Sequence, residues 1–147
     1  MTLRALSGRT RAESADDLQT WLQHLSGCPT VNHTVAAVCA NSRHEEPATW
    51  FYVEADRGEG VARMRCLSCG TARSLLDSEE RWTFPPTWSC LECAQSIAEV
   101  AFGMHLEDDD SVTWVAVGVR CVNCGDISGV ADFVVPARAL DEVTTAL

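Results

Sequence analysis

The chain has 147 residues, of which 46% are hydrophobic and 22% are charged, a composition typical of a globular protein. Its 21 acidic and 11 basic side chains give a net charge of −10, which opposes binding to a phosphate backbone. No apolar run approaches the roughly 18 residues that a membrane span needs, and the N-terminal residues lack an apolar signal segment, so we expect neither a membrane protein nor a secreted one.

The first predicted element is an amphipathic helix that begins after Ser14. Serine is a favourable N-cap, acidic residues follow in the first turn, and Gly27 is a stop signal. The apolar residues at helical spacing are Leu18, Trp21, Leu22 and Leu25. We therefore assign residues 1–27 to an N-terminal arm and helix.

From residue 33 on, apolar residues alternate with a period of two, which is typical of strands. The predicted strands cover 33–42, 49–56, 60–65, a short segment after the first cysteine pair, 96–107, 112–120 and 126–135. Turns rich in acidic residues or glycine join 49–56 to 60–65 and 96–107 to 112–120, which predicts two hairpins. Pro136 then predicts a short C-terminal helix over 136–147, on which Leu140, Val143 and Leu147 share one face.

A six-residue motif closes each predicted hairpin. It reads RCLSCG at 65–70 and RCVNCG at 120–125, and a further C-x-x-C pair, Cys90 and Cys93, precedes the second hairpin. We call 65–70 the first knuckle, 90–94 the second and 120–125 the third. Placing Cys28 on Cys90 puts Val31 on Cys93, so the first copy of the repeat lacks one cysteine there and requires an insertion, which we assign to 42–48.

Six of the eight cysteines occur in these C-x-x-C pairs. Because the chain is expected in the reducing cytoplasm, this pattern favours metal binding over disulfides. Zinc takes four sulfur or nitrogen donors in a tetrahedron, and a tight turn supplies two of them at once. Gly70 and Gly125 permit the left-handed backbone of such a turn, whereas Ala94 follows Cys93, so we expect the second knuckle to depart from the pattern.

The paired knuckles resemble those of the zinc ribbon superfamily, which has rubredoxin as its iron-binding relative. The predicted fold is mostly β, a small α+β protein with two tandem zinc-ribbon-like modules at 28–80 and 81–135. The N-terminal helix and the helix over 136–147 flank these modules, which are expected to share one core.

The pairs and the repeat predict two zinc ions with two ligand sets. The hairpin over 96–120 brings its own ends together, so one set is Cys90, Cys93, Cys121 and Cys124. The equivalent set in the first copy is Cys66, Cys69, Cys28 and His33, and His24 is an alternative to His33. Iron would also accept tetrahedral sulfur ligands.

Two alternatives stay open at this point. Cys39 and His44 repeat a C-x-x-x-x-H spacing, but Cys39 alternates with apolar neighbours and is interpreted as a core residue. His44 and His105 are interpreted as surface residues. A single site made of Cys66, Cys69, Cys90 and Cys93 would leave Cys121 and Cys124 as free thiols.

The function expected from these features is that of a non-enzymatic structural-zinc protein that acts as an interaction or regulatory module in the cytoplasm. The absence of Lys among the 11 basic residues indicates a GC-rich, bacterial source. The aromatic connector 81–88 is the candidate contact for a partner protein. The alternatives are a transcription- or nucleic-acid-associated ribbon, a thiol-based zinc switch, and an open catalytic zinc if His33 does not bind.

Overall fold

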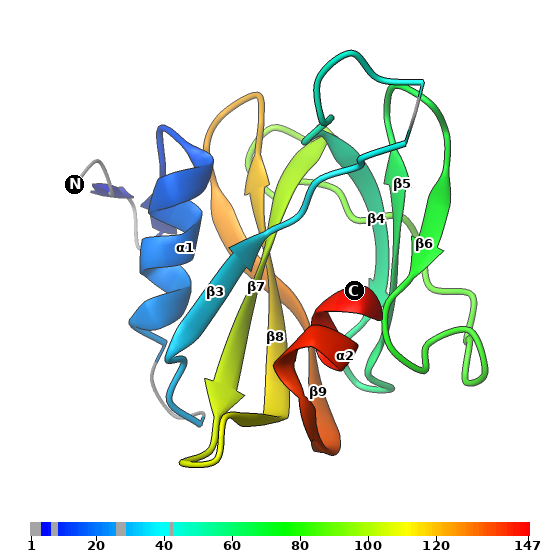
Figure 1. Ribbon diagram of the computed structural model, residues 1–147. Helices are drawn as coiled ribbons and strands as arrows, with labels where there is room; N and C mark the ends of the chain where they lie inside the picture. The colour runs from blue at the N-terminus through cyan, green and yellow to red at the C-terminus, as the bar shows by residue number, and fades with distance from the viewer. Residues whose placement is uncertain (1–3, 7–8, 26–28, 42) are drawn as a thin grey trace.

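The computed structural model describes residues 4–6, 9–25, 29–41 and 43–147 (Figure 1). The fold is mostly β with two short helices, as predicted, and strands β3 to β9 form one seven-stranded sheet. The elements are β1 (Arg4–Leu6), β2 (Arg9–Arg11), α1 (Ala15–Gln23), β3 (His33–Ala36), β4 (Phe51–Asp56), β5 (Val61–Cys66), β6 (Ala72–Ser74), β7 (Ala98–Leu106), β8 (Ser111–Cys121), β9 (Ile127–Ala139) and α2 (Leu140–Thr145).

The sheet runs in the order β6-β5-β4-β7-β8-β9, and β3 also pairs with β7. Both predicted hairpins are present, as β4–β5 and β7–β8, with antiparallel pairing throughout. A single pair, Phe51 with Ala98, connects them. The first predicted strand is shorter than expected, because β3 ends at Ala36 and the chain then becomes irregular.

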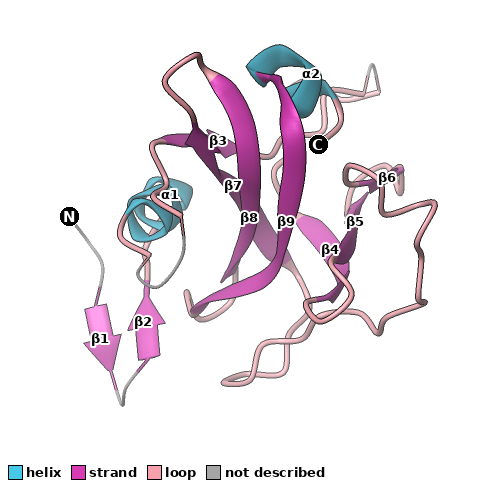
Figure 2. Cartoon of the chain, turned by 90° about the horizontal axis from the view of Figure 1, so that it is seen from below, coloured by secondary structure: helices cyan, strands magenta, loops and turns pink. Residues whose placement is uncertain are grey.

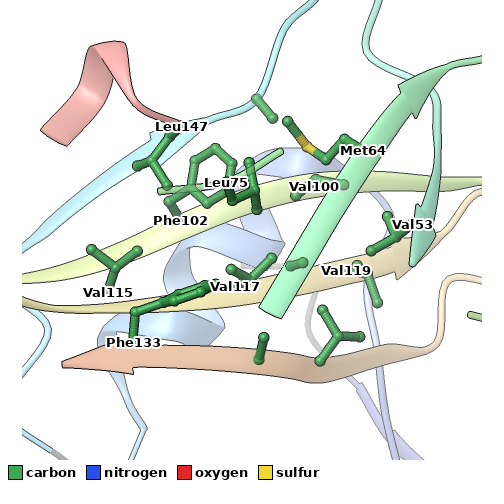
Figure 3. Packing of buried hydrophobic residues seen from close by; sticks show 14 of the residues in the cluster. Val53, Met64, Leu75, Val100, Phe102, Val115, Val117, Val119, Phe133 and Leu147 are labelled. Atoms are coloured by element: carbon green, nitrogen blue, oxygen red, sulfur yellow. The ribbon is translucent and has the colours of Figure 1, made fainter. Parts of the chain in front are cut away.

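The main core lies between the two hairpins (Figure 3). Inward side chains of β4 and β5 pack in one cluster with those of β7, β8 and β9, so both halves of the repeat contribute to the same apolar interior. Among its members are Val53, Met64, Val100, Phe102, Val117 and Phe133. The cluster positions the start of β7 and the end of β5, where the cysteine knuckles begin.

Helix α1 covers the opposite face of β7 and β8 (Figure 2). Its Leu18 and Leu22 are fully buried, and Ser14 is the N-cap residue, as predicted, although its side chain makes no capping hydrogen bond. The helix approaches closely because β8 carries Gly118, where a Cβ would lie 3.1 Å from Leu22 Cδ2. The centre of β8 is therefore buried on both faces, whereas simple alternation predicts burial on one.

The C-terminal helix begins later than predicted. β9 continues through Pro136 to Ala139, and α2 spans only Leu140–Thr145. Pro136 falls in a register shift between Val134 and Arg138 of this edge strand, where a missing N–H costs no ladder hydrogen bond. The predicted apolar face is nevertheless correct, since Val143 and Leu147 join the main core.

In the described part of the chain, neither helix has the length and apolar character that crossing a membrane would require. Gly27 and Cys28 lie outside the described residues.

Candidate metal centres

Four thiols converge where the β7–β8 hairpin opens. Ala98 at the start of β7 pairs with Cys121 at the end of β8, so the second knuckle is brought beside the third. We call Cys90, Cys93, Cys121 and Cys124 group B, and their ligand atoms all lie within 4.8 Å of one another. The structure thus gathers all four residues of this predicted ligand set.

The spacing of the sulfurs in group B matches a tetrahedral metal site. Cys93 Sγ lies 3.5 Å from Cys121 Sγ, and Cys90 Sγ lies 3.6 Å from Cys124 Sγ. Zn–S bonds of about 2.3 Å in a tetrahedron place two sulfurs about 3.8 Å apart. These two distances are within a few tenths of an ångström of that value, and the remaining sulfur pairs lie within 4.8 Å, so the four thiols could surround one ion.

A second group forms at the open end of the β4–β5 hairpin. Cys39, His44, Cys66 and Cys69, which we call group A, place their ligand atoms within 4.8 Å of one another. Cys39 Sγ lies 3.7 Å from Cys69 Sγ, and Cys66 Sγ lies 3.6 Å from His44 Nε2. A tetrahedral zinc site with one imidazole places nitrogen and sulfur about 3.6 Å apart. Group A could therefore hold a metal ion with three thiolates and one histidine.

Only Cys66 and Cys69 of the predicted first ligand set occur in group A. His33 pairs with Met104 on β7, whereas the first knuckle adjoins Phe51, which pairs with Ala98. Six positions along a strand span about 20 Å, which is beyond the reach of an imidazole. The role of Cys28 stays a prediction, since that residue is outside the described ones, and the His24 ring instead lies 2.7 Å from the carbonyl oxygen of Thr20.

The repeat aligns differently from the prediction. Leu67 N–H donates to Trp50 O in the first copy, and Val122 N–H donates to Ile97 O in the second. The structural equivalent of Ala98 is thus Phe51, and the residues equivalent to Cys90 and Cys93 are expected shortly before Phe51. The proposed insertion at 42–48 is the segment that carries His44, and the signal that could have revealed it is the C-x-x-x-x-H spacing from Cys39.

The three knuckles share one turn. In each, the N–H that follows the second cysteine donates to the carbonyl of the first cysteine: Gly70 to Cys66 at 2.9 Å, Ala94 to Cys90 at 2.8 Å and Gly125 to Cys121 at 2.9 Å. The donor residues have φ angles of 74°, 63° and 81°. Ala94 adopts the left-handed conformation without being glycine. The expected departure of the second knuckle from the pattern was therefore wrong for the backbone of the turn.

Replacing Ala94 with glycine is expected to stabilise the protein by about 1 kcal/mol. A left-handed backbone costs a residue with a side chain roughly 1–2 kcal/mol, and glycine avoids this cost. The greater conformational freedom of glycine in the unfolded chain offsets part of the gain. Ala94 is exposed, so the change removes few packing contacts. Urea denaturation of the metal-loaded protein measures the difference. A destabilised Ala94→Gly variant would contradict the assignment of this turn.

The pKa values of the cysteines are shifted in opposite directions within each group. A hydrogen bond from Thr71 lowers the pKa of Cys69 to about 6, and one from the Asn123 side chain lowers the pKa of Cys93 to about 6. Burial acts in the opposite direction, raising the pKa of Cys124 to about 12 and also raising the pKa values of Cys39 and Cys121. Each group therefore combines a cysteine whose pKa is lowered, Cys69 or Cys93, with at least one whose pKa is raised.

A bound divalent cation would lower the pKa of every cysteine that coordinates it, because it favours the thiolate form. All seven cysteines in the described residues are free thiols, six of them in the two groups' C-x-x-C pairs. Each group supplies four donors from the protein, which is the arrangement of closed structural metal sites.

No family model, curated protein or solved structure matches this chain. The interpretation of the two groups therefore rests on their own geometry.

Proposed function

We propose that this protein is a structural-zinc protein that binds two ions, one in group A and one in group B. The observation that carries the proposal is that two sets of four sulfur or imidazole donors lie within 4.8 Å of one another at equivalent ends of two hairpins. Zinc suits three thiolates with one imidazole as well as four thiolates. The closed donor sets favour a structural role over catalysis.

Zinc counting separates group A from the ligand set predicted from sequence. Cys39→Ser and His44→Ala are each expected to lower the zinc content from two ions to one per chain, while His33→Ala keeps two. The reason is that, among the residues the structure describes, Cys39 and His44 are the two that gather with Cys66 and Cys69. Native mass spectrometry of zinc-loaded protein measures the stoichiometry.

Two results would overturn this assignment. Wild-type protein that carries a single zinc would reject the two-ion proposal, and loss of an ion in His33→Ala with retention in Cys39→Ser would reject group A. A brown or red colour in the purified protein would replace zinc with iron.

We further propose that the zinc sites serve a protein-interaction or regulatory module. Support comes from large apolar side chains left at the surface: Phe84 is 84% exposed, Leu91 84% and Val134 89%. In the connector 81–88, Trp82 is covered by Arg63, whose guanidinium lies 4.4 Å from the ring centroid, so Phe84 is the connector's exposed contact. The net charge of −10 favours a protein over a nucleic acid as partner.

The interaction role is tested by affinity capture from the native host with zinc-loaded wild-type protein and a Phe84→Ala variant. Because Phe84 is exposed, the variant is expected to keep its zinc and its melting temperature while losing captured protein. Salt-dependent binding to random DNA or RNA, with no protein captured, would reject this role in favour of nucleic-acid association.

A further inference from the structure

The third knuckle already binds a short extended segment of this chain. Ala12 N–H donates to the carbonyl of Gly125 at 2.7 Å. Arg120 Nε donates to Ala12 O and its Nη2 donates to Glu13 O, both at 2.9 Å. One guanidinium and one carbonyl of the R-C-x-x-C-G motif thus hold two residues of backbone, and Ala12 is only 5% exposed in this contact.

The first knuckle has the same framework. Besides the turn hydrogen bonds, Cys66 N–H donates to Thr71 O at 3.0 Å, as Cys121 N–H donates to Asp126 O at 2.9 Å. Arg65 precedes Cys66 on β5 as Arg120 precedes Cys121 on β8. The first knuckle therefore has its glycine carbonyl in the equivalent place in the turn and an arginine at the equivalent sequence position.

The two knuckles differ in what covers them. Gly125, Asp126 and Ile127 are buried, whereas their equivalents Gly70, Thr71 and Ala72 are exposed. A Cβ built on Gly125 would lie 2.4 Å from Ala12 O, but one built on Gly70 meets no atom within 4 Å in the described part of the chain.

The arginine of the first knuckle is also placed differently. Arg120 is oriented by an ion pair with Glu99 at 2.7 Å, its neighbour across the β7–β8 pair. Arg65 has Tyr52 at that position, and its Nη1 folds back to donate to Gly70 O at 3.0 Å. Both Arg65 and Tyr52 are exposed, so the guanidinium can rotate off Gly70 O at the cost of one surface hydrogen bond.

We propose that the first knuckle is a docking site for an extended peptide segment of a partner protein, bound as the third knuckle binds Ala12 and Glu13. The peptide's N–H bonds to Gly70 O, and two successive carbonyls accept from Arg65. A small residue faces the knuckle, an acidic residue follows it, and Tyr52 supplies an adjacent flat surface. This inference deepens the proposed interaction function and rests on it.

The test uses the peptide RTRAESADD, residues 9–17 of this sequence, as a probe of the zinc-loaded, ¹⁵N-labelled full chain. Addition of the peptide up to several millimolar is expected to shift the amide signals of Arg65, Gly70 and Thr71, while those of Gly125 stay in place. Arg65→Gln is expected to weaken binding about tenfold, because it removes the charge-assisted hydrogen bonds. Arg138→Gln, which changes an exposed arginine on β9, serves as the matched control and keeps wild-type affinity.

The outcomes separate this inference from the function on which it rests. Protein that carries two zinc ions but shows no shift at the first knuckle overturns the docking site alone, as do shifts confined to Gly125 or an Arg65→Gln variant with unchanged affinity. Protein that carries no zinc rejects the structural-zinc proposal. Captured host protein that Arg65→Gln retains leaves the interaction role standing and rejects this docking site.

Discussion

Removal of zinc from group B is expected to abolish the cooperative thermal unfolding transition of the whole chain. Structural zinc contributes apparent binding free energies of roughly 10–16 kcal/mol in small domains, against a total stability of about 5–15 kcal/mol for a typical protein. Group B joins the start of β7 to the end of β8, two interior strands of the sheet. Losing this connection frees the ends of the hairpin that supplies much of the main core.

The buried apolar core couples the two hairpins. Val100, Phe102 and Val117 are buried in a cluster that the β7–β8 hairpin shares with β4 and β5. Each such side chain contributes about 1.5–3 kcal/mol, but ordering the backbone costs about 1–2 kcal/mol for every residue. Because the two hairpins share this cluster, we expect unfolding of one to destabilise the other.

Thermal denaturation followed by circular dichroism, with and without a zinc chelator, measures this prediction. Returning zinc should restore the transition. Like zinc removal, Cys121→Ser should abolish the transition, whereas Cys39→Ser should only lower Tm, since group A connects the shorter β4–β5 hairpin to an irregular segment. A Tm that is unaffected by the chelator would show that the core alone holds the fold.

The hairpins could be predicted because their information is local. Period-two alternation and glycine or acidic turns specify β4–β5 and β7–β8 within short windows, and each R-C-x-x-C-G motif directly follows its strand. The late start of α2 could not be predicted in this way, since it depends on β9 being an edge strand that tolerates Pro136. That placement is a property of the assembled sheet.

The sequence pattern did not bring Cys39 and His44 together with Cys66 and Cys69, for a physical reason. Cys39 alternates with apolar neighbours, which predicts a buried strand position, but β3 ends at Ala36 and Cys39 forms only an isolated bridge with Ala48. His44 belongs to a loop without the C-x-x-C pattern. The alignment of the repeat on Cys28 did not use the pairing of Phe51 with Cys66, which makes the segment just before Phe51 the counterpart of the segment that carries Cys90 and Cys93.

Replacing Gly125 with alanine is expected to lower the free energy of unfolding by about 3 kcal/mol, whereas Gly70→Ala should lower it by only about 1 kcal/mol. Both alanines would have to adopt a left-handed backbone, but only the one at position 125 would also clash with backbone atoms. The φ angles, 81° and 74°, are nearly equal. The Cβ at 125 would displace Ala12 O, which is the carbonyl oxygen that accepts from Arg120 Nε.

Urea denaturation of the two zinc-loaded variants measures this difference, and zinc counting checks that both retain two ions. Gly70→Ala is the matched control for Gly125→Ala. The two glycines occupy the same place in equivalent turns and differ in whether residues 12 and 13 cover them. If both variants lose the same free energy, the N-terminal segment does not hold the third knuckle in solution. The contrast between a covered and an uncovered knuckle, on which the docking site depends, would then be lost as well.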